Sequence, residues 1–281
     1  MKLQTLILAA GKGTRMYSKL PKVMHSIAGK SMLMHVWSTA TALQGNDIYI
    51  IYGFGGEQII NAHSEIAAKW ILQVEQLGTG HAVMQAQDVL EDDSIVLVLF
   101  GDVPLIAKAT LEKLIAKVSV QSIALITMNV ENPYGYGRIV RNTNNQIIKI
   151  IEEKDATSEE RSIKEVNTGI MAVPGNKLKS WLACLNNLNA QGEYYLTDII
   201  QLAVTDGVDV ASVQPEFDYE VLGVNTKVQL HQLERIYQNK QAETLMSQGV
   251  TIRDATRFDL RGELTHIGQD VEIDVNVIIE R

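Results

Sequence analysis

The sequence predicts an α/β protein whose core is a mostly parallel β-sheet covered by helices on both faces. Three observations support this fold class. Strands and helices alternate through roughly the first 130 residues, a glycine-rich loop follows the first strand, and polar loops follow the later strands. Such alternation is typical of parallel sheets, in which ligands bind beyond the carboxyl ends of the strands. We therefore expect a binding site at one edge of this sheet.

The expected elements follow one another in a regular order. Apolar runs predict strands at 5–10, 47–53, 70–75, 94–102 and 122–130. Segments with helical periodicity or a mixed polar and apolar pattern lie between them, at 31–43, 55–66, 80–90 and 108–118. The middle of the chain predicts a hairpin, GRIVRN (137–142) and QIIKIIEEK (146–154), and then a strand, VNTGIMAVP (166–174). These segments would form a small inserted β layer over the sheet edge.

The C-terminal part has a different pattern. Residues 226–248 predict one long amphipathic helix that ends at Gly249. After it, Ile267, Ile273 and Ile279 recur every six residues, which is typical of a hexapeptide β-helix. A solenoid needs at least about three repeats to bury a core, and fewer than that are present.

Composition narrows the possible functions. The 281 residues are 46% hydrophobic and carry a formal net charge of −8, which argues against general nucleic-acid or anionic-membrane binding. The single cysteine, Cys184, lies in a helical pattern and is expected in the core. It allows no intrachain disulfide, and no signal peptide or long apolar segment is visible, so we expect a cytoplasmic protein.

The loop GKGTRMYSKLPK (11–22) predicts an anion site. Glycines expose backbone N–H groups, and Arg15 and Lys22 add positive charge, with Pro21 fixing the backbone before Lys22. A dinucleotide fingerprint does not fit because Met16 stands where its third glycine would be, and the Walker spacing is absent. An ordinary tight turn with surface cations remains the alternative to phosphate binding.

Other polar residues could complete such a site. Asp102 follows an apolar strand and could bind Mg²⁺ near phosphates, although a turn-forming aspartate is an equal alternative. Asn167 and Asn225 could bind sugar hydroxyls or a metal, and Gln73 could recognise a base edge. Taken singly, each of these is more often a turn or surface residue.

Taken together, the motifs resemble a known family. LAAGKGTRMYSKLPK is similar to the signature of sugar-phosphate nucleotidylyltransferases, and EQLGTGHA, GDVPL, GYGRI, EEKDA, NTGI, GEYYLTDII and VLGVNT follow in order. With LERIYQ, RFDLRG and VEIDVNVII, the whole chain resembles the bacterial bifunctional N-acetylglucosamine-1-phosphate uridylyltransferase/glucosamine-1-phosphate acetyltransferase family (GlmU). The resemblance implies a Rossmann-like, mostly parallel sheet of the nucleotide-diphospho-sugar transferase type, followed by a long linker helix and the first turns of a left-handed β-helix.

The resemblance also implies the reaction and its residues. A uridylyl group would pass from UTP to N-acetylglucosamine 1-phosphate, giving UDP-N-acetylglucosamine and pyrophosphate for peptidoglycan and lipopolysaccharide precursors, with Mg²⁺ as cofactor. Arg15, Lys22 and Asp102 would be catalytic, and Asp102 and Asn225 would bind the metal. Nucleotide-binding residues would be Leu8, Ala9, Ala10, Gly11, Lys22, Gln73, Gly78, Thr79, Phe100, Gly101 and Asp102, where Phe100 replaces the tyrosine of the family. Sugar-binding residues would be Gly137, Glu152, Asn167, Thr168 and Asn225, with Glu153 as the alternative to Glu152.

The same resemblance implies a domain division. Residues 1–225 would form the uridylyltransferase domain, 226–248 the linker helix and 249–281 a truncated acetyltransferase β-helix. The family's homotrimer and its acetyl transfer would then be absent, leaving a monomer or a weak oligomer. UTP–glucose-1-phosphate transfer, GTP–mannose-1-phosphate transfer and a non-catalytic nucleotide-sugar sensor are the competing interpretations.

Overall fold

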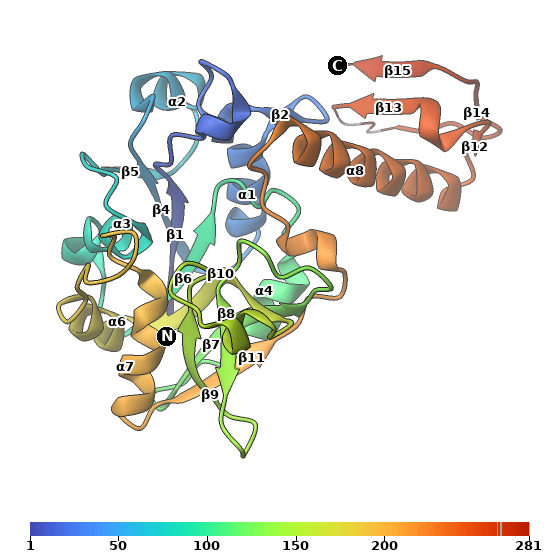
Figure 1. Ribbon diagram of the computed structural model, residues 1–281. Helices are drawn as coiled ribbons and strands as arrows, with labels where there is room; N and C mark the ends of the chain where they lie inside the picture. Colours follow the sequence, from blue (N-terminus) through green and yellow to red (C-terminus); the bar gives the residue numbers. More distant parts are fainter. Residues whose placement is uncertain (263, 265, 281) are drawn as a thin grey trace.

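A nine-stranded sheet forms the centre of the computed structural model, which describes residues 1–262, 264 and 266–280 (Figure 1). Seven of its strands, in spatial order, are β11 (Asp209–Val213), β7 (Ser122–Asn129), β10 (Glu165–Pro174), β6 (Ser94–Phe100), β1 (Lys2–Ala9), β4 (Asn46–Tyr52) and β5 (Lys69–Leu72). All neighbours in this row pair in parallel except β10, which runs antiparallel to both β6 and β7. The predicted mostly parallel sheet is therefore confirmed.

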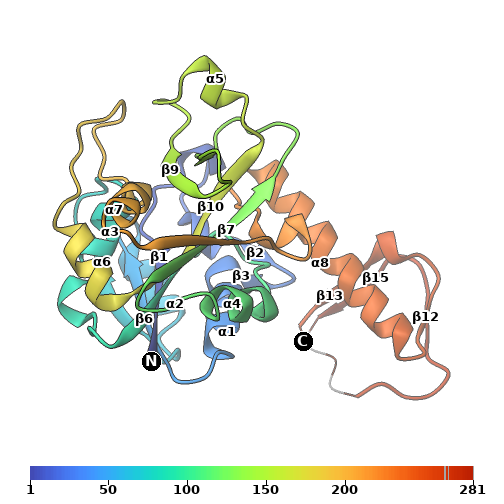
Figure 2. The same ribbon diagram turned by 90° about the horizontal axis from the view of Figure 1, so that it is seen from below.

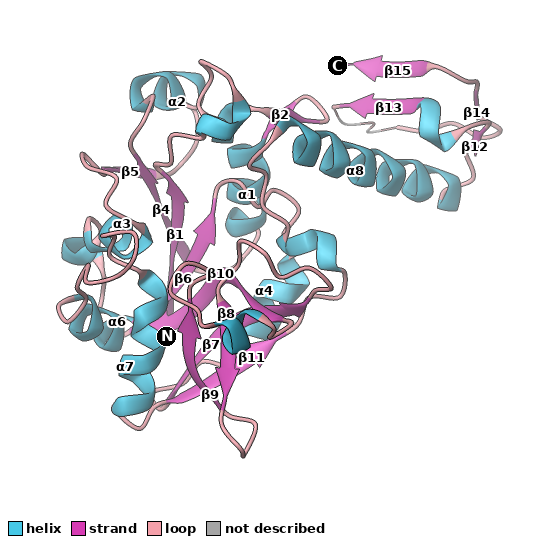
Figure 3. Ribbon diagram, viewed as in Figure 1, coloured by secondary structure: helices cyan, strands magenta, loops and turns pink. Residues whose placement is uncertain are grey.

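Helices cover both faces of this sheet (Figure 3). One face packs against α1 (Met32–Thr41), α2 (Gly56–Ala62) and α4 (Lys108–Ile115), and the other against α3 (Thr79–Met84), α6 (Gly175–Leu182) and α7 (Ile199–Thr205). Alternate residues of one strand belong to different cores, because successive side chains of a strand point to opposite faces. Ile7 of β1 lies in the first core, whereas Leu6 and Leu8 lie in the second.

The predicted hairpin is present as β8 (Arg138–Arg141) and β9 (Ile147–Ile151), which pair antiparallel. It joins the sheet where Val166 of β10 pairs with Arg138. The short helix α5 (Ser158–Arg161) follows, with a capping box between Thr157 and Glu160. A small antiparallel pair, β2 (Ser26–Ile27) and β3 (Lys30–Ser31), lies between the glycine-rich loop and α1.

The long C-terminal helix is α8 (Lys227–Ser247), close to its predicted range, and Gly249 follows with a positive φ of 96°. Two short parallel pairs follow, β12 (Thr251–Ile252) with β14 (Glu272–Ile273), and β13 (Phe258–Arg261) with β15 (Val277–Glu280). In both views these strands lie beside α8 and away from the central sheet (Figure 1, Figure 2). The β-helix and the domain division stay predictions, and residues 263, 265 and 281 of this segment lie outside the described residues.

Helix α8 packs against two separate hydrophobic clusters. Near its start, Leu233 lies with Val224, Met16, Ile27 and Met32, so the glycine-rich loop is in contact with the helix region through Met16. Near its end, Ala242 and Leu245 lie with residues of the C-terminal strands, including Phe258, which is completely buried. The methionine that breaks the dinucleotide fingerprint is therefore a packing residue, and only 1% of its surface is exposed.

Three details differ from the sequence predictions. The strand at 166–174 was expected in the inserted β layer, but as β10 it lies inside the central sheet, because it pairs with both β6 and β7. The segment expected as a helix at 80–90 is interrupted, because α3 ends at Met84 and only a 3₁₀ turn at Gln87–Val89 follows. Cys184 is exposed rather than buried in the core, because α6 ends at Leu182 and the cysteine lies beyond it. The burial of Trp181 and Leu182 already satisfies the apolar face of that helix.

Candidate active site

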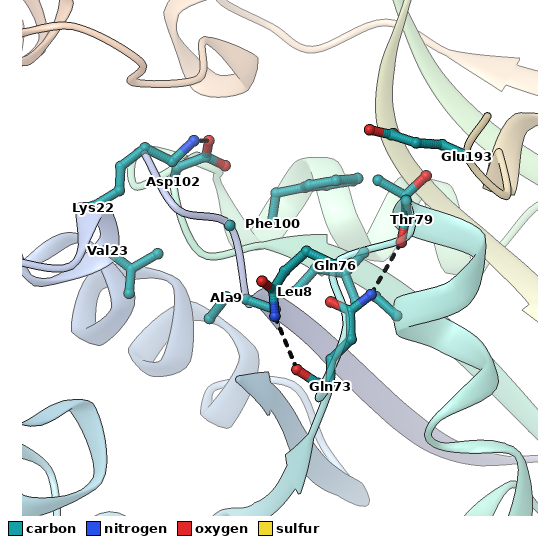
Figure 4. A pocket seen from close by; sticks show the side chains of 14 residues that line it. Leu8, Ala9, Lys22, Val23, Gln73, Gln76, Thr79, Phe100, Asp102 and Glu193 are labelled. Carbon is teal, nitrogen blue, oxygen red and sulfur yellow. Dashed lines mark hydrogen bonds and ion pairs between the residues drawn. The ribbon is translucent and has the colours of Figure 1, made fainter. Parts of the chain in front are cut away.

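A pocket of about 240 Å³ opens beyond the carboxyl ends of β1, β5 and β6 (Figure 4). It brings together the glycine-rich loop and the loops that follow β5 and β6, as expected from their positions after strands. Of the residues proposed to bind nucleotide, all but Gly101 line it: Leu8, Ala9, Ala10, Gly11, Lys22, Gln73, Gly78, Thr79, Phe100 and Asp102. Gly101 lies beside the pocket, and its N–H donates to the carbonyl of Leu8 at 2.9 Å.

The glycine-rich loop needs its glycine at position 13. Gly13 has a positive φ of 60°, and a Cβ there would lie 2.6 Å from Cβ of Lys22. A side chain at this position would push Lys22 out of place, so the loop conformation and the lysine position depend on each other. Arg15 lies in a 3₁₀ turn at Thr14–Met16 and is exposed, and it is not among the residues that line the pocket.

Three predicted residues converge at the other end of the pocket. The Lys22 ammonium forms an ion pair with Oδ2 of Asp102 and donates to Oδ1 of Asn225 at 3.0 Å. The backbone N–H of Val224 donates to the carbonyl of Asp102 at 2.9 Å, which holds the segment before α8 against the end of β6. Two oxygen atoms from distant parts of the chain thus face one cationic group.

Gln73, which follows β5, is held by several hydrogen bonds and is only 3% exposed. Its Nε2 lies 3.2 Å from the carbonyl oxygen of Gly78 and 3.1 Å from Nδ1 of His81. Its backbone carbonyl accepts from Nε2 of Gln76 at 3.1 Å, so the two glutamine amides lie side by side in the pocket (Figure 4). Because a carbonyl oxygen accepts only, the nitrogen of the Gln73 amide must face Gly78.

Four of the five predicted sugar-binding residues, Gly137, Glu152, Asn167 and Thr168, lie where β8 meets β10, whereas Asn225 lies beside Lys22. The backbone N–H of Asn167 donates to the carbonyl of Gly137 at 2.8 Å, and Oδ1 of Asn167 accepts from the N–H of Gly169 at 3.1 Å. A Cβ on Gly137 would lie 3.4 Å from both carboxylate oxygens of Glu152. The hydroxyl of Thr168 donates instead to the carbonyl of Ile126 at 2.8 Å, so it is hydrogen-bonded to β7 of the central sheet.

The two adjacent glutamates have different surroundings. Glu152 accepts from the hydroxyl of Thr197 at 2.9 Å, and burial raises the pKa of its carboxyl, with nearby Asp198 adding to the effect. Glu153 instead forms an ion pair at 2.6 Å with Arg138, whose side chain is almost fully buried. The hydrogen bond from Arg138 lowers the pKa of Glu153. Glu152 therefore faces Gly137 with a spare oxygen, whereas Glu153 neutralises a buried cation.

Several residues of this site were not predicted from the sequence. Gln76 and Glu193 line the pocket, and His81 contacts Gln73 from the first turn of α3. All three lie in motifs that carried the family resemblance, EQLGTGHA and GEYYLTDII. Because these two motifs carried the family resemblance, they could have identified all three residues from the sequence.

Comparison with known proteins agrees with this geometry. Residues 4–219 match the model of the family described as nucleotidyl transferase. The chain belongs to the nucleotidyl transferase family. It is 55% identical over 280 residues to the bifunctional protein GlmU of Methylococcus capsulatus, a match that spans all of this chain and 61% of the length of that relative.

Two solved structures share the fold of this nucleotidyl transferase. One is a nucleotidyl transferase from Methanothermobacter thermautotroptrophicus, with a TM-score of 0.61 and 14% identity, covering 84% of this chain and 97% of the other. The second is a Bacillus anthracis protein assigned as a glucose-1-phosphate thymidylyltransferase, with a TM-score of 0.64 and 20% identity, covering 83% and 94%.

The described residues contain neither a cluster of metal-ligating side chains nor a membrane-spanning helix. Across residues 1–262, 264 and 266–280, no group of three or more His, Cys, Asp or Glu side chains is placed to hold a metal ion. In the same part of the chain, no helix combines the length and the apolar character that crossing a bilayer requires.

Proposed function

We propose that this nucleotidyl transferase moves a uridylyl group from UTP to N-acetylglucosamine 1-phosphate, releasing pyrophosphate and forming UDP-N-acetylglucosamine. The observation that carries the proposal is the pocket itself, where the glycine-rich loop, Gln73 and the Lys22–Asp102 pair meet at one sheet edge. The 55% identity to a GlmU protein supports the choice of nucleotide and sugar. We further propose that the protein acts in the cytoplasm, where UTP is available.

The base would lie against Gln73, Gly78 and Thr79. With Nε2 of Gln73 turned to Gly78 and His81, its Oε1 is the atom left to accept a hydrogen bond. Uracil offers an N–H at the ring position where cytosine has a bare nitrogen, so a fixed acceptor selects uracil. Gly78 has a positive φ of 107°, and a Cβ there would lie 2.6 Å from the carbonyl oxygen of Tyr194. The loop can approach the base closely only without a side chain at this position.

The phosphates would lie along residues 8–11 and Lys22. Backbone N–H groups of a glycine-rich loop bind phosphate oxygens, and a lysine adds a mobile positive charge. The acceptor phosphate is already a nucleophile, so no general base is needed. Catalysis then consists of holding it in line with the α-phosphorus and balancing charge on the departing pyrophosphate.

Asp102 and Asn225 fit a Mg²⁺ ion. A carboxylate and an amide oxygen are ligands of the kind that Mg²⁺ takes, and it usually keeps several waters beside them. Both oxygens already point at one positive charge, the Lys22 ammonium. When bound, the ion would neutralise charge on the phosphate oxygens. Lys22 would then be free to contact phosphate.

The sugar would lie between Gly137, Glu152 and Asn167, with Asn225 completing its site and Thr168 behind it. Glu152 keeps one oxygen for a sugar hydroxyl, because the hydroxyl of Thr197 is donated to Oε1 alone. The bare backbone at Gly137 leaves space in front of that carboxylate. The ion pair of Glu153 with Arg138 favours Glu152 as the residue that contacts the sugar.

A pyrophosphate-release assay tests the proposal. We expect release from UTP only with N-acetylglucosamine 1-phosphate, and not from UTP with glucose 1-phosphate or from GTP with mannose 1-phosphate. A higher kcat/KM with either alternative pair would assign a different reaction. Binding of UDP-N-acetylglucosamine without turnover of any pair would support the non-catalytic sensor.

A further inference from the structure

Gln73 can recognise a base only if its amide has one fixed orientation, because a free glutamine amide can flip to suit either uracil or cytosine. Gly78 provides one hydrogen-bond acceptor for its two N–H groups. The second acceptor in reach is Nδ1 of His81, at 3.1 Å. With both bonds made, neither N–H of this buried amide is left without a partner, and Oε1 is the only atom free to face a ligand.

The position of His81 is itself fixed. It lies in the first turn of α3, directly after the Gly78–Gly80 loop, and the N–H of Gly80 donates to the carbonyl of Tyr194 at 2.8 Å. The ring of Tyr194 lies 6.2 Å from the His81 ring, centroid to centroid. The imidazole is therefore held between the pocket wall and the segment that includes Glu193.

The tautomer of His81 follows from its neighbours. Nε2 of Gln85 also lies 3.2 Å from Nε2 of His81, so amide nitrogens are placed next to both ring nitrogens. A neutral imidazole accepts at one nitrogen only. Gln73 is buried and cannot turn without setting its oxygen against the oxygen of Gly78, so its second N–H needs Nδ1 of His81 as an acceptor. Nε2 of Gln85 instead donates to the backbone carbonyl of His81 at 3.1 Å, so it needs no lone pair on the ring. The lone pair therefore belongs to Nδ1 and the proton to Nε2.

We propose that His81 is a positioning residue that locks the Gln73 amide and thereby sets the preference for uracil over cytosine. The proposal rests on the proposed uridylyl transfer and deepens it. His81 acts through Gln73 rather than on the substrate. Its removal should therefore change which base is accepted more than it changes the chemical step.

Three variants test this role. His81→Leu keeps much of the volume and removes the acceptor. His81→Asn places an amide oxygen near the position of Nδ1. Gln85→Leu removes the contact at the other ring nitrogen and the hydrogen bond to the backbone carbonyl of His81, and leaves the Gln73 contact in place. For each variant, kcat and KM are measured with UTP and with CTP, together with Tm. If His81→Leu does not fold, His81→Gln is tested in its place. The glutamine side chain is longer than that of asparagine, so its acceptor oxygen would lie beyond Gln73 and could not fix the Gln73 amide.

The expected result is a selective loss. His81→Leu should lower the UTP/CTP ratio of kcat/KM by about tenfold, mainly through the KM for UTP, because one hydrogen bond no longer fixes the amide. His81→Asn should keep most of the ratio, and Gln85→Leu should leave it unchanged. An unchanged ratio in His81→Leu, or equal losses in the Asn and Leu variants, would overturn the proposal.

Equilibrium binding separates this inference from the proposed function. UTP and CTP are titrated into the same variants without a sugar phosphate, so the ratio of the two Kd values needs no turnover. A wild-type protein that prefers UTP but transfers nothing would contradict the proposed reaction, and the variants would still test His81. A wild-type protein with no preference for UTP would overturn the role of His81.

Discussion

Replacing Glu153 by glutamine should weaken the fold and spare the sugar site, whereas the same change at Glu152 should do the reverse. The two side chains are adjacent in sequence and equal in size, so each variant is the matched control for the other. Glu153 neutralises Arg138, which is 1% exposed. Glu152 faces Gly137, and no cation among the described residues forms an ion pair with it. The comparison therefore separates a structural carboxylate from a binding one.

The cost at Glu153 can be estimated from its surroundings. Breaking a buried ion pair costs about 3–5 kcal/mol because the remaining charge is left uncompensated. Here the side chain of Glu153 is 23% exposed, and Arg138 keeps carbonyl partners at Tyr136 and Arg161. Solvent screening reduces the figure to about 1–3 kcal/mol. At about 2 °C per kcal/mol for a chain of this size, Tm should fall by about 2–6 °C.

The pH dependence of the two variants should differ in sign. Hydrogen bonding to Arg138 lowers the pKa of Glu153 below its usual 4.5, so its stabilisation is present above that value and is lost as pH falls through the lowered pKa. Burial raises the pKa of Glu152 above 4.5, so the fold is penalised as pH rises through the raised pKa. Glu152→Gln should therefore raise Tm at neutral pH and have little effect below about pH 4.

Thermal unfolding across pH and steady-state kinetics with varied N-acetylglucosamine 1-phosphate measure both effects. Losing one hydrogen bond to a charged group, about 1.5–3 kcal/mol, should raise the sugar-phosphate KM roughly tenfold or more in Glu152→Gln. Glu153→Gln should keep a near-normal KM below its Tm. A larger rise of that KM in Glu153→Gln than in Glu152→Gln would contradict these roles, and so would a wild-type Tm of Glu153→Gln at neutral pH.

Three further predictions concern the nucleotide end of the site. Asp102→Asn should lower turnover on the order of a hundredfold, because an anionic metal ligand is lost, and near-normal pyrophosphate release at limiting Mg²⁺ would contradict the metal assignment. Arg15→Lys should lower kcat/KM for UTP roughly tenfold or more, since lysine cannot present a planar pair of donors to phosphate; unchanged kinetics would leave this exposed arginine without a phosphate role. Gly78→Ala should raise the KM for UTP strongly, because its Cβ would meet the carbonyl oxygen of Tyr194 at 2.6 Å, and a normal KM would place the base elsewhere.

Much of the fold could be predicted because its determinants are local. Apolar runs bounded by glycine and polar residues gave the sheet strands, and the helical pattern at 226–248 gave α8 almost to the residue. The position of Asp102 after a buried strand was enough to place it at the ligand edge. The antiparallel direction of β10 was not predictable, because it depends on the path of the chain through the hairpin.

The unpredicted features depend on distant partners. Whether Glu152 or Glu153 faces the proposed sugar site depends on the register of β8 with β9 and on where the Arg138 side chain is buried. The orientation of Gln73 depends on the Gly78 carbonyl and on His81, and neither the carbonyl direction nor the ring tautomer can be read from residue types. Arg15 was expected to add positive charge to the anion site, but the turn that buries Met16 leaves Arg15 exposed and outside the pocket lining.

The burial of Met16 affects the mobility of the phosphate loop. Fixing the backbone of one residue costs about 1–2 kcal/mol of conformational entropy. Because β1 holds the start of the loop and Met16 holds its middle in the cluster of Val224 and Leu233, substrate has fewer loop residues to order. Looser packing in this cluster, as in Leu233→Ala, would enlarge the mobile segment. Nucleotide affinity would then fall without the loss of any nucleotide contact, and faster amide hydrogen exchange around Met16 would reveal the cause.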